Sequence, residues 1–267
     1  MNLRWKRTVL ASLCGLTAAA ALSVPALGAR TVPVQVDGSA LEGTAYLESG
    51  VTYVPLRSLL DAFGGWELSW DSKTRTAVAD GADATLTADP AAGTVSLDAA
   101  VYAGKVYVQN GRTYVPLRLV AELLGGAAEW DRYFGGAAVT SPDADHDAAD
   151  LYWLSRIISA ESRGEVLEGQ IAVGNVVLNR TGDAAFPDTI PAVIFDRNHG
   201  VQFEPVSNGT VYQQPAALSV EAAKRVLDGE NTAGDALYFY APALSQGTWI
   251  NANRTYLLTI GCHRFYL

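Results

Sequence analysis

A glutamate at the end of an apolar helical stripe is the residue of this chain best suited to chemistry. Leu151, Leu154, Ile158 and Glu161 are spaced i, i+3, i+7 and i+10, which places them on one face of a helix. A carboxyl on a core-facing stripe is costly unless it is paired, hydrogen-bonded or at the edge of a cleft. Desolvation there raises the pKa of the carboxyl, as a general acid requires. Glu161 is therefore the candidate general acid/base.

A structural role for Glu161 is the alternative. Acids near helix ends are commonly solvated or salt-bridged, and Arg156 or Arg163 lies close enough in sequence to serve as a partner. Geometry alone leaves both interpretations open.

The residues around Glu161 resemble a known family. Ala160–Glu165 reads A-E-S-R-G-E, and Gly169–Arg180 reads G-Q-I-A-V-G-N-V-V-L-N-R. Both segments are similar to the catalytic core of the SleB-type cell-wall hydrolases, bacterial enzymes that cleave peptidoglycan. Further matching segments continue in the same order to the end of the chain: 186–190, 193–195, 202–203, 236–240, 249–250 and 260–265. The resemblance covers about residues 151–267.

The resemblance implies cleavage of glycan strands, with Glu161 as general acid/base. Most glycosidases use two carboxylates. Some members of this family act as lytic transglycosylases, in which one glutamate serves as acid and then as base, and the muramic acid 6-hydroxyl closes a 1,6-anhydro ring. Glu165 and Glu168 follow Glu161 closely, and Glu165 is predicted to be a structural partner of Arg163 or of free backbone N–H groups. If a water must be activated instead, the conceivable bases are Asp183, Asp188 and Asp196.

Polar and aromatic residues after Glu161 are candidates for contact with sugar. Asn175 and Asn179 are four residues apart on a predicted helix over 170–180, and Gln170 begins it. Such amides either bond to neighbouring backbone or face a cleft, and both alternatives stay open. Most aromatic residues of predicted strands over 236–240 and 255–260 belong to a core. The predicted substrate-binding residues are Arg163, Gln170, Asn175, Tyr238, Tyr240 and Trp249.

The sequence favours neither a metal site nor a thiol nucleophile. The three histidines, His146, His199 and His263, are too few and too scattered for a zinc amidase, so no metal and no cofactor are predicted. Cys262 directly precedes His263 near the end of the chain, whereas a papain-like peptidase places its cysteine well before the histidine. Core packing is the stronger interpretation of that pair.

The N-terminal segment is predicted to be a secretory signal over residues 1–29. Three basic residues precede an apolar run over 9–22, and Ala26-Leu27-Gly28 provides a small-x-small cleavage site. Cleavage removes three basic residues and no acid, so the formal charge falls from −9 to −12. An acidic chain is an unlikely partner for nucleic acid. The predicted location is secreted or in the cell wall, extracellular or spore-associated, with peptidoglycan as partner and no stable membrane span after cleavage.

The region after the signal repeats itself. Thr52–Arg57 reads T-Y-V-P-L-R and recurs unchanged at Thr113–Arg118, an offset of 61 residues. Trp70-Asp71 returns at Trp130-Asp131 with an offset of 60. Each unit, about 31–80 and 92–141, is predicted to contain short strands, a helix and a further strand. The repeats resemble the stalk-like module named after the copper amine oxidase N-terminal domain, and are interpreted as a spacer or wall-binding arm.

The acidic segment 142–150 is predicted to be a linker, because it is polar, contains a proline and lacks apolar periodicity. Asp150 is predicted to cap a helix that begins at Leu151. The predicted domains are a stalk over 30–141 and a SleB-like domain over 151–267. The predicted fold class is α+β: two small α+β repeats followed by a mainly helical, lysozyme-like domain with a small β-sheet. A non-enzymatic wall-binding protein that keeps this fold is the rival to the enzyme.

Overall fold

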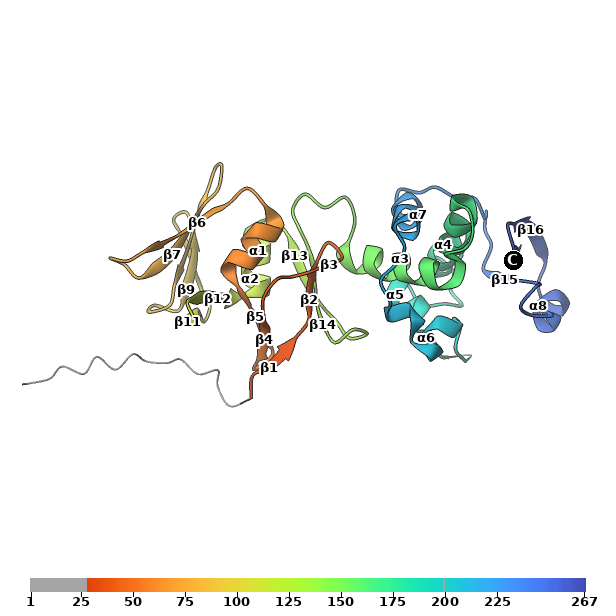
Figure 1. Cartoon of the computed structure of the whole chain (residues 1–267), viewed down its shortest axis with the longest axis horizontal. Coiled ribbons are helices and arrows are strands. Elements are labelled where there is room, and N and C mark those ends of the chain that lie inside the picture. The colour runs from red at the N-terminus through yellow and green to blue at the C-terminus, as the bar shows by residue number, and fades with distance from the viewer. Residues whose placement is uncertain (1–27, 199) are drawn as a thin grey trace, which may run out of the picture.

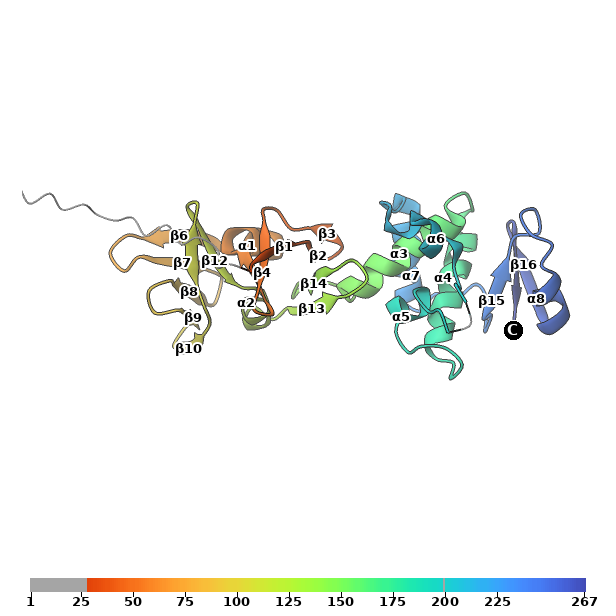
Figure 2. The same cartoon turned by 90° about the horizontal axis from the view of Figure 1, so that it is seen from below.

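The computed structural model describes residues 28–198 and 200–267. Residues 1–27 of the predicted signal and His199 lie outside the described residues. The strand-rich part, the helical part and a small C-terminal sheet follow one another along the long axis in both views (Figures 1 and 2). This order agrees with the predicted α+β class. Within the described residues, no helix combines the length and apolarity required to cross a bilayer.

The strand-rich part contains two short helices among its strands. Its elements are β1 (Arg30–Val32), β2 (Val34–Val36), β3 (Ser39–Ala40), β4 (Ala45–Glu48), β5 (Val51–Pro55), α1 (Leu56–Phe63), β6 (Glu67–Asp71), β7 (Thr76–Asp80), β8 (Thr85–Asp89), β9 (Thr94–Leu97), β10 (Ala100–Ala103), β11 (Tyr107–Gln109), β12 (Arg112–Pro116), α2 (Leu117–Leu123), β13 (Ala127–Asp131) and β14 (Gly136–Thr140).

The two repeats are intertwined and do not form separate units. One sheet has the order β1-β4-β5-β12-β11, so that β5 of the first repeat and β12 of the second pair at its centre. Strands β2 and β3 of the first repeat complete the sheet of β13 and β14, while β9 and β10 complete the sheet of β6, β7 and β8. A single apolar core runs through both repeats. Neither repeat can therefore bury its apolar face alone.

Both repeat helices follow a proline directly. Pro55 and Pro116 end their strands in extended conformation and occupy the N-cap positions, directly before the first helical turn. Leu56, Leu59 and Leu60 of α1 are buried, and their three- and four-residue spacing places them on one face of the helix. Helix α1 ends at Gly64, whose positive φ suits glycine and whose N–H donates to the carbonyl of Leu60.

The C-terminal half is mainly helical. Its elements are α3 (Ala148–Ser162), α4 (Leu167–Thr181), α5 (Ile190–Ile194), α6 (Glu204–Asn208), η1 (Thr210–Tyr212), α7 (Ala217–Leu227), β15 (Tyr238–Tyr240), α8 (Thr248–Asn253), β16 (Tyr256–Ile260) and β17 (His263–Tyr266). Helices α3, α4 and α7 pack on one another around an apolar core, and the three strands form a sheet of order β15-β17-β16.

Helix α3 begins earlier than the sequence indicated. It starts at Ala148, and Asp147 caps it by accepting hydrogen bonds from the N–H groups of Ala149 and Asp150. Asp150 lies within the first turn, so its predicted capping role is wrong. Burial and the nearby Asp147 and Glu129 raise the pKa of Asp150 to about 6.

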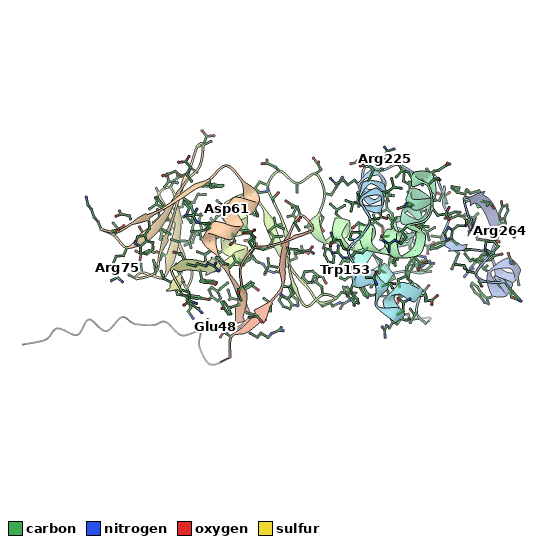
Figure 3. The ribbon with its side chains drawn as sticks, in the orientation of Figure 1. Glu48, Asp61, Arg75, Trp153, Arg225 and Arg264 are labelled. Carbon is green, nitrogen blue, oxygen red and sulfur yellow. The ribbon has the colours of Figure 1, made fainter. Side chains whose placement is uncertain are left out.

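The junction between the two halves is packed. The indole N–H of Trp153 on α3 donates to the carboxylate of Asp131 at the end of β13. Tyr133 stacks on Phe195, and Phe134 packs against Tyr152. Trp153 lies where the strand-rich part meets the helices (Figure 3). The acidic segment before α3 therefore spans a joint held by side chains on both sides.

Candidate active site

Glu161 occupies the last turn of α3, where the buried stripe of the helix reaches the surface. Leu154 and Ile158 on the same face are fully buried, whereas Glu161 is partly exposed. The helix ends one residue later: the N–H of Arg163 makes the last regular hydrogen bond, to the carbonyl of Ser159, and Gly164 follows. Within the described part of the chain, no hydrogen bond or ion pair reaches the Glu161 carboxyl, so neither Arg156 nor Arg163 neutralises it.

Two hollows meet at Glu161. One, of about 380 Å³, is lined on its far side by Arg156, Arg163 and Asn208. The other, of about 780 Å³, is lined by the aromatic residues of the C-terminal sheet and its helix. Glu161, Glu204 and Leu244 line both hollows. The surface therefore carries one open groove that passes Glu161 on both sides, which suits a polymer that enters and leaves the site.

Burial changes the acidity of Glu161. Desolvation in the groove raises the pKa of its carboxyl from 4.5 to about 7, and the nearby charge of Glu204 adds to the increase. At neutral pH a large fraction of the carboxyl therefore carries its proton. A carboxylic acid in this range can both give and take a proton during a reaction at neutral pH.

Glu204 is a second carboxylate that the sequence did not single out. It is the first residue of α6 and lines both hollows beside Glu161. The three aspartates considered as bases, Asp183, Asp188 and Asp196, line neither hollow. Glu204 lies 43 positions after Glu161 with no motif linking the two.

The larger hollow has an aromatic wall with two arginines. Tyr238, Tyr240 and Trp249, which were predicted to contact substrate, all line it. The guanidinium of Arg254 lies 4.3 Å from the ring centre of Tyr238 and 5.1 Å from that of Trp249. These contacts fix the rings in place while Trp249 stays largely exposed. An exposed, oriented ring provides a flat apolar surface for the face of a sugar.

Arg180 is a cleft residue that the substrate-binding prediction missed, although it ends the recognised motif. Its side chain is 4 % exposed and lies against the rings of Phe186, Phe203 and Tyr238. Its Nε donates to the carbonyl of Leu237, but its Nη1 is buried without a hydrogen-bond partner. Burial lowers the pKa of Arg180 to about 10, against the opposing influence of Tyr238 and Asp196. Arg180 therefore lines the groove with a buried donor that lacks an acceptor within the described residues.

Gln170 and Asn175 do not reach the groove, and their prediction as substrate ligands disagrees with the structure. Gln170 is fully buried; its amide donates to the carbonyl of Glu165 and accepts from the hydroxyl of Ser219. Asn175 is buried and holds the segment after α7 through the carbonyl of Glu230 and the N–H of Thr232. Helical spacing could not distinguish these interior amides from cleft amides because both interrupt an apolar face.

Glu165 has the structural role predicted for it, with backbone N–H as its partner. One oxygen accepts from the N–H of Cys262 in the turn between β16 and β17, and the other lies 3.7 Å from His263 Nδ1. A Cβ on Gly261 would overlap this carboxylate, and the positive φ of Gly261 independently favours glycine in the turn. His263 is buried against Phe239, as the core-packing prediction requires, whereas Cys262 is exposed, so that prediction is wrong for the cysteine.

Comparisons with known proteins identify relatives of both halves of the chain. The profile of the family described as Cell Wall Hydrolase matches residues 164–266. The cell wall hydrolase CwlJ of Oceanobacillus iheyensis is 31 % identical over 103 residues, which cover 36 % of this chain and 72 % of that protein. The chain belongs to the cell wall hydrolase family. A second profile, described as Copper amine oxidase N-terminal domain, matches residues 35–141 and confirms the resemblance of the repeats.

Two further relatives of this cell wall hydrolase carry more specific names. The spore cortex-lytic enzyme of Oceanobacillus iheyensis is 32 % identical over 141 residues, 53 % of this chain and 50 % of that protein. The chain thus matches half the length of that relative. The solved catalytic domain of the germination-specific lytic transglycosylase SleB from Bacillus anthracis is 32 % identical, with a TM-score of 0.42, over 46 % of this chain and 98 % of that domain.

Proposed function

We propose that this protein cleaves the glycan strands of peptidoglycan, with Glu161 as general acid and then general base. The observation that carries the proposal is a carboxyl without a protein partner, placed where two hollows join into one groove. Family membership supports it, as do the names of the relatives, which act on cell wall or spore cortex. The proposed place of action is accordingly the cell wall or the spore cortex.

The proposed reaction begins with a proton. Protonated Glu161 donates it to the glycosidic oxygen, the bond from that oxygen to the anomeric carbon breaks, and positive charge develops on that carbon. Glu161, now a carboxylate, takes the proton of the muramic acid 6-hydroxyl, whose oxygen bonds to the anomeric carbon. The products are a free hydroxyl on the leaving sugar and a 1,6-anhydro end, and Glu161 recovers its proton.

The groove residues have distinct proposed roles. Tyr238, Tyr240 and Trp249 form the aromatic side of the larger hollow, on which a pyranose ring can stack. Arg163 lines the smaller hollow and can donate to sugar or peptide oxygens on the other side of Glu161. Glu204 lies near the developing positive charge, where a carboxylate stabilises it. If Glu204 instead activates a water, the same groove performs hydrolysis.

The experiment uses purified peptidoglycan and the variants Glu161→Gln and Glu168→Gln. Glutamine keeps the shape of the acid but cannot transfer its proton, so Glu161→Gln should lower the rate by about a hundredfold or more. Glu168 is exposed at the start of α4 and lines neither hollow, so its variant should retain wild-type activity. Near wild-type turnover by Glu161→Gln with an unchanged fold would contradict the assignment.

The rival function, wall binding without catalysis, predicts a different result in the same assay. A non-enzymatic protein would release no soluble fragments from peptidoglycan, and Glu161→Gln would be indistinguishable from the wild-type chain. Release of fragments that depends on Glu161 excludes that alternative.

A further inference from the structure

The strand-rich part carries two hollows that correspond to each other through the internal repeat. The first, of about 470 Å³, includes Arg57, Asp61 and Trp70 from the first repeat, together with Gly111 and Thr113 from the second. The second, of about 670 Å³, includes the corresponding Arg118, Glu122 and Trp130 from the second repeat, together with Gly50 and Thr52 from the first. Each hollow is thus built by both repeats, and we refer to the pair as the twin grooves.

The pairing of the central strands explains this reciprocity. Strands β5 and β12 run antiparallel with Val54 opposite Val115, and these two residues are 61 positions apart. Each residue at the centre of this strand pair therefore lies opposite its own counterpart in the other repeat, so the two repeats are related by an approximate twofold axis between β5 and β12. As a result, the hairpin turn before β5 lies near α2, and the hairpin turn before β12 lies near α1.

The arginine of each groove is held in the same way. Arg57 Nη2 donates to the carbonyl of Leu68 over 3.1 Å, and Arg118 Nε donates to the carbonyl of Ala128 over 3.0 Å. Both arginines are the second residue of a helix, and both carbonyls lie on the edge strand that carries the groove's tryptophan. The guanidinium is thereby fixed beside the indole while its remaining N–H groups stay free to bind a ligand.

The tryptophans are exposed in both grooves. Trp70 is 47 % exposed on β6 and Trp130 is 40 % exposed on β13, each opposite an alanine, Ala77 or Ala137, that also lines its groove. An indole that remains exposed at the corresponding position of both repeats is not required by the shared core. Arg30 lies 5.7 Å from the ring centre of Trp130 and closes one end of the second groove.

The charges of the described residues balance in each groove. Two arginines and two carboxylates line the first, Glu42, Arg57, Asp61 and Arg112. Two of each also line the second: Arg30, Arg118, Glu122 and Glu129. A net charge of zero gives no attraction for a polyanion or a polycation. An exposed indole flanked by paired donors and acceptors, with a threonine hydroxyl nearby, suits an uncharged ring that has an apolar face and hydroxyl or amide groups around its edge.

We infer that the twin grooves bind the uncharged sugar backbone of wall glycan, one strand segment in each. The indole stacks on a sugar ring, and the arginine, carboxylate and threonine bond to hydroxyl and acetamido groups. Binding at two sites on one polymer multiplies the individual affinities, because the second contact forms within an existing complex. This inference concerns a site other than the Glu161 groove and does not depend on catalysis.

The test measures binding of the chain from Arg30 onward to N-acetylglucosamine oligomers, which carry the hydroxyl and acetamido groups of wall glycan and no charge. All variants carry Glu161→Gln, so that the polymer stays intact. We expect Trp70→Ala or Trp130→Ala alone to weaken binding several-fold and the double variant to weaken it by at least tenfold. Tyr102→Ala is the matched control, because Tyr102 is an exposed aromatic residue of the same half that lines neither groove. The double variant Asp61→Asn and Glu122→Gln removes hydrogen-bond acceptors without removing apolar packing and should also weaken binding.

Three results would overturn the inference. One is equal binding by the parent and the Trp70→Ala, Trp130→Ala double variant when thermal unfolding shows both to be folded. The second is that the chain binds isolated stem peptides as tightly as it binds the glycan. The third is that it binds an anionic wall polymer in preference to the glycan. Cleavage of short soluble glycan by the double variant with Glu161 intact should equal that of the wild type. Failure of the wild type to cleave would count against the proposed function and leave the grooves' binding unaffected.

Discussion

Replacing Glu161 with glutamine should stabilise the protein above neutral pH while it removes activity. Burial raises the pKa of Glu161 from 4.5 to about 7 in the folded chain, which means that ionisation of this carboxyl destabilises the folded state. The stability contributed by the protonated form is fully present below pH 4.5 and is lost as pH rises through 7. A shift of this size corresponds to about 3 kcal/mol of unfolding free energy at pH 8.

Glutamine has the shape of the acid but carries no charge at any pH. The variant and the wild type should therefore have the same stability at pH 4, and the variant should be more stable at pH 8. For a chain of this size, about 3 kcal/mol corresponds to a difference in Tm of roughly 5–10 °C. Circular dichroism during heating at both pH values measures the two differences directly.

Glu168→Gln is the control for this experiment. Glu168 is exposed, so its variant should show no gain in Tm between pH 4 and pH 8. The reasoning is refuted if Glu161→Gln melts with the wild type at pH 8, or if its Tm advantage is equal at both pH values. Either result would show that the charged carboxyl is well solvated in the folded protein.

Further predictions concern activity, products and the two structural contacts. The wild-type kcat/KM should fall about tenfold from pH 6 to pH 8 at fixed ionic strength as Glu161 loses its proton; a rate that climbs past pH 8 contradicts this role. Mass spectrometry should find 1,6-anhydro ends, in the wild type and in residual digests by Glu204→Gln; mainly reducing ends, lost in that variant, would identify Glu204 as the base of a hydrolase. Removing all residues before Ala148 should lower the Tm of the helical part, measured by calorimetry, because Trp153 loses its hydrogen-bond acceptor and aromatic cover; an unchanged Tm would show that the joint contributes nothing. Gly261→Ala should lower the Tm of the whole chain, since its Cβ would overlap the carboxylate beneath the turn; an unchanged Tm would show that the turn can move away without cost.

The packed joint has a consequence for how the two halves act together. Trp153 is fully buried on α3, the same helix that carries Glu161 at its other end. Its indole N–H bonds to Asp131, which also accepts from the N–H groups of Tyr133 and Phe134. The strand-rich part therefore holds the first half of the helix that presents the acid. Substrate held in the twin grooves would be held by a body fixed to that helix.

The mechanism does not require the amides of α4 to touch the substrate. Gln170 and Asn175 join α4 to the start of α7 and to the segment after it. These contacts fix the core on which α3 rests. Their replacement is therefore expected to affect stability more than substrate affinity.

Features that depend on local order could be predicted from the amino-acid sequence. The spacing of Leu154, Ile158 and Glu161 placed the acid on the buried face of a helix, because side chains three or four positions apart share a face. The 61-residue offset identified two copies of one unit, and the alternating aromatic residues indicated the C-terminal strands. The same local patterns predicted the aromatic residues Tyr238 and Trp249 that line the groove.

Contacts between residues far apart in the sequence depend on how the whole chain folds. Glu204 lies beside Glu161 because the chain folds back so that α6 lies near the end of α3. Arg180 lines the groove because the C-terminal sheet packs against α4. Parallel pairing of β14 with β2 joins the ends of the repeat region and intertwines its units. No local period encodes such contacts, because loop closure and packing of the whole core select them. The same physics buries Gln170, whose sequence position looks like that of a surface amide, and leaves the Glu161 carboxyl open to substrate.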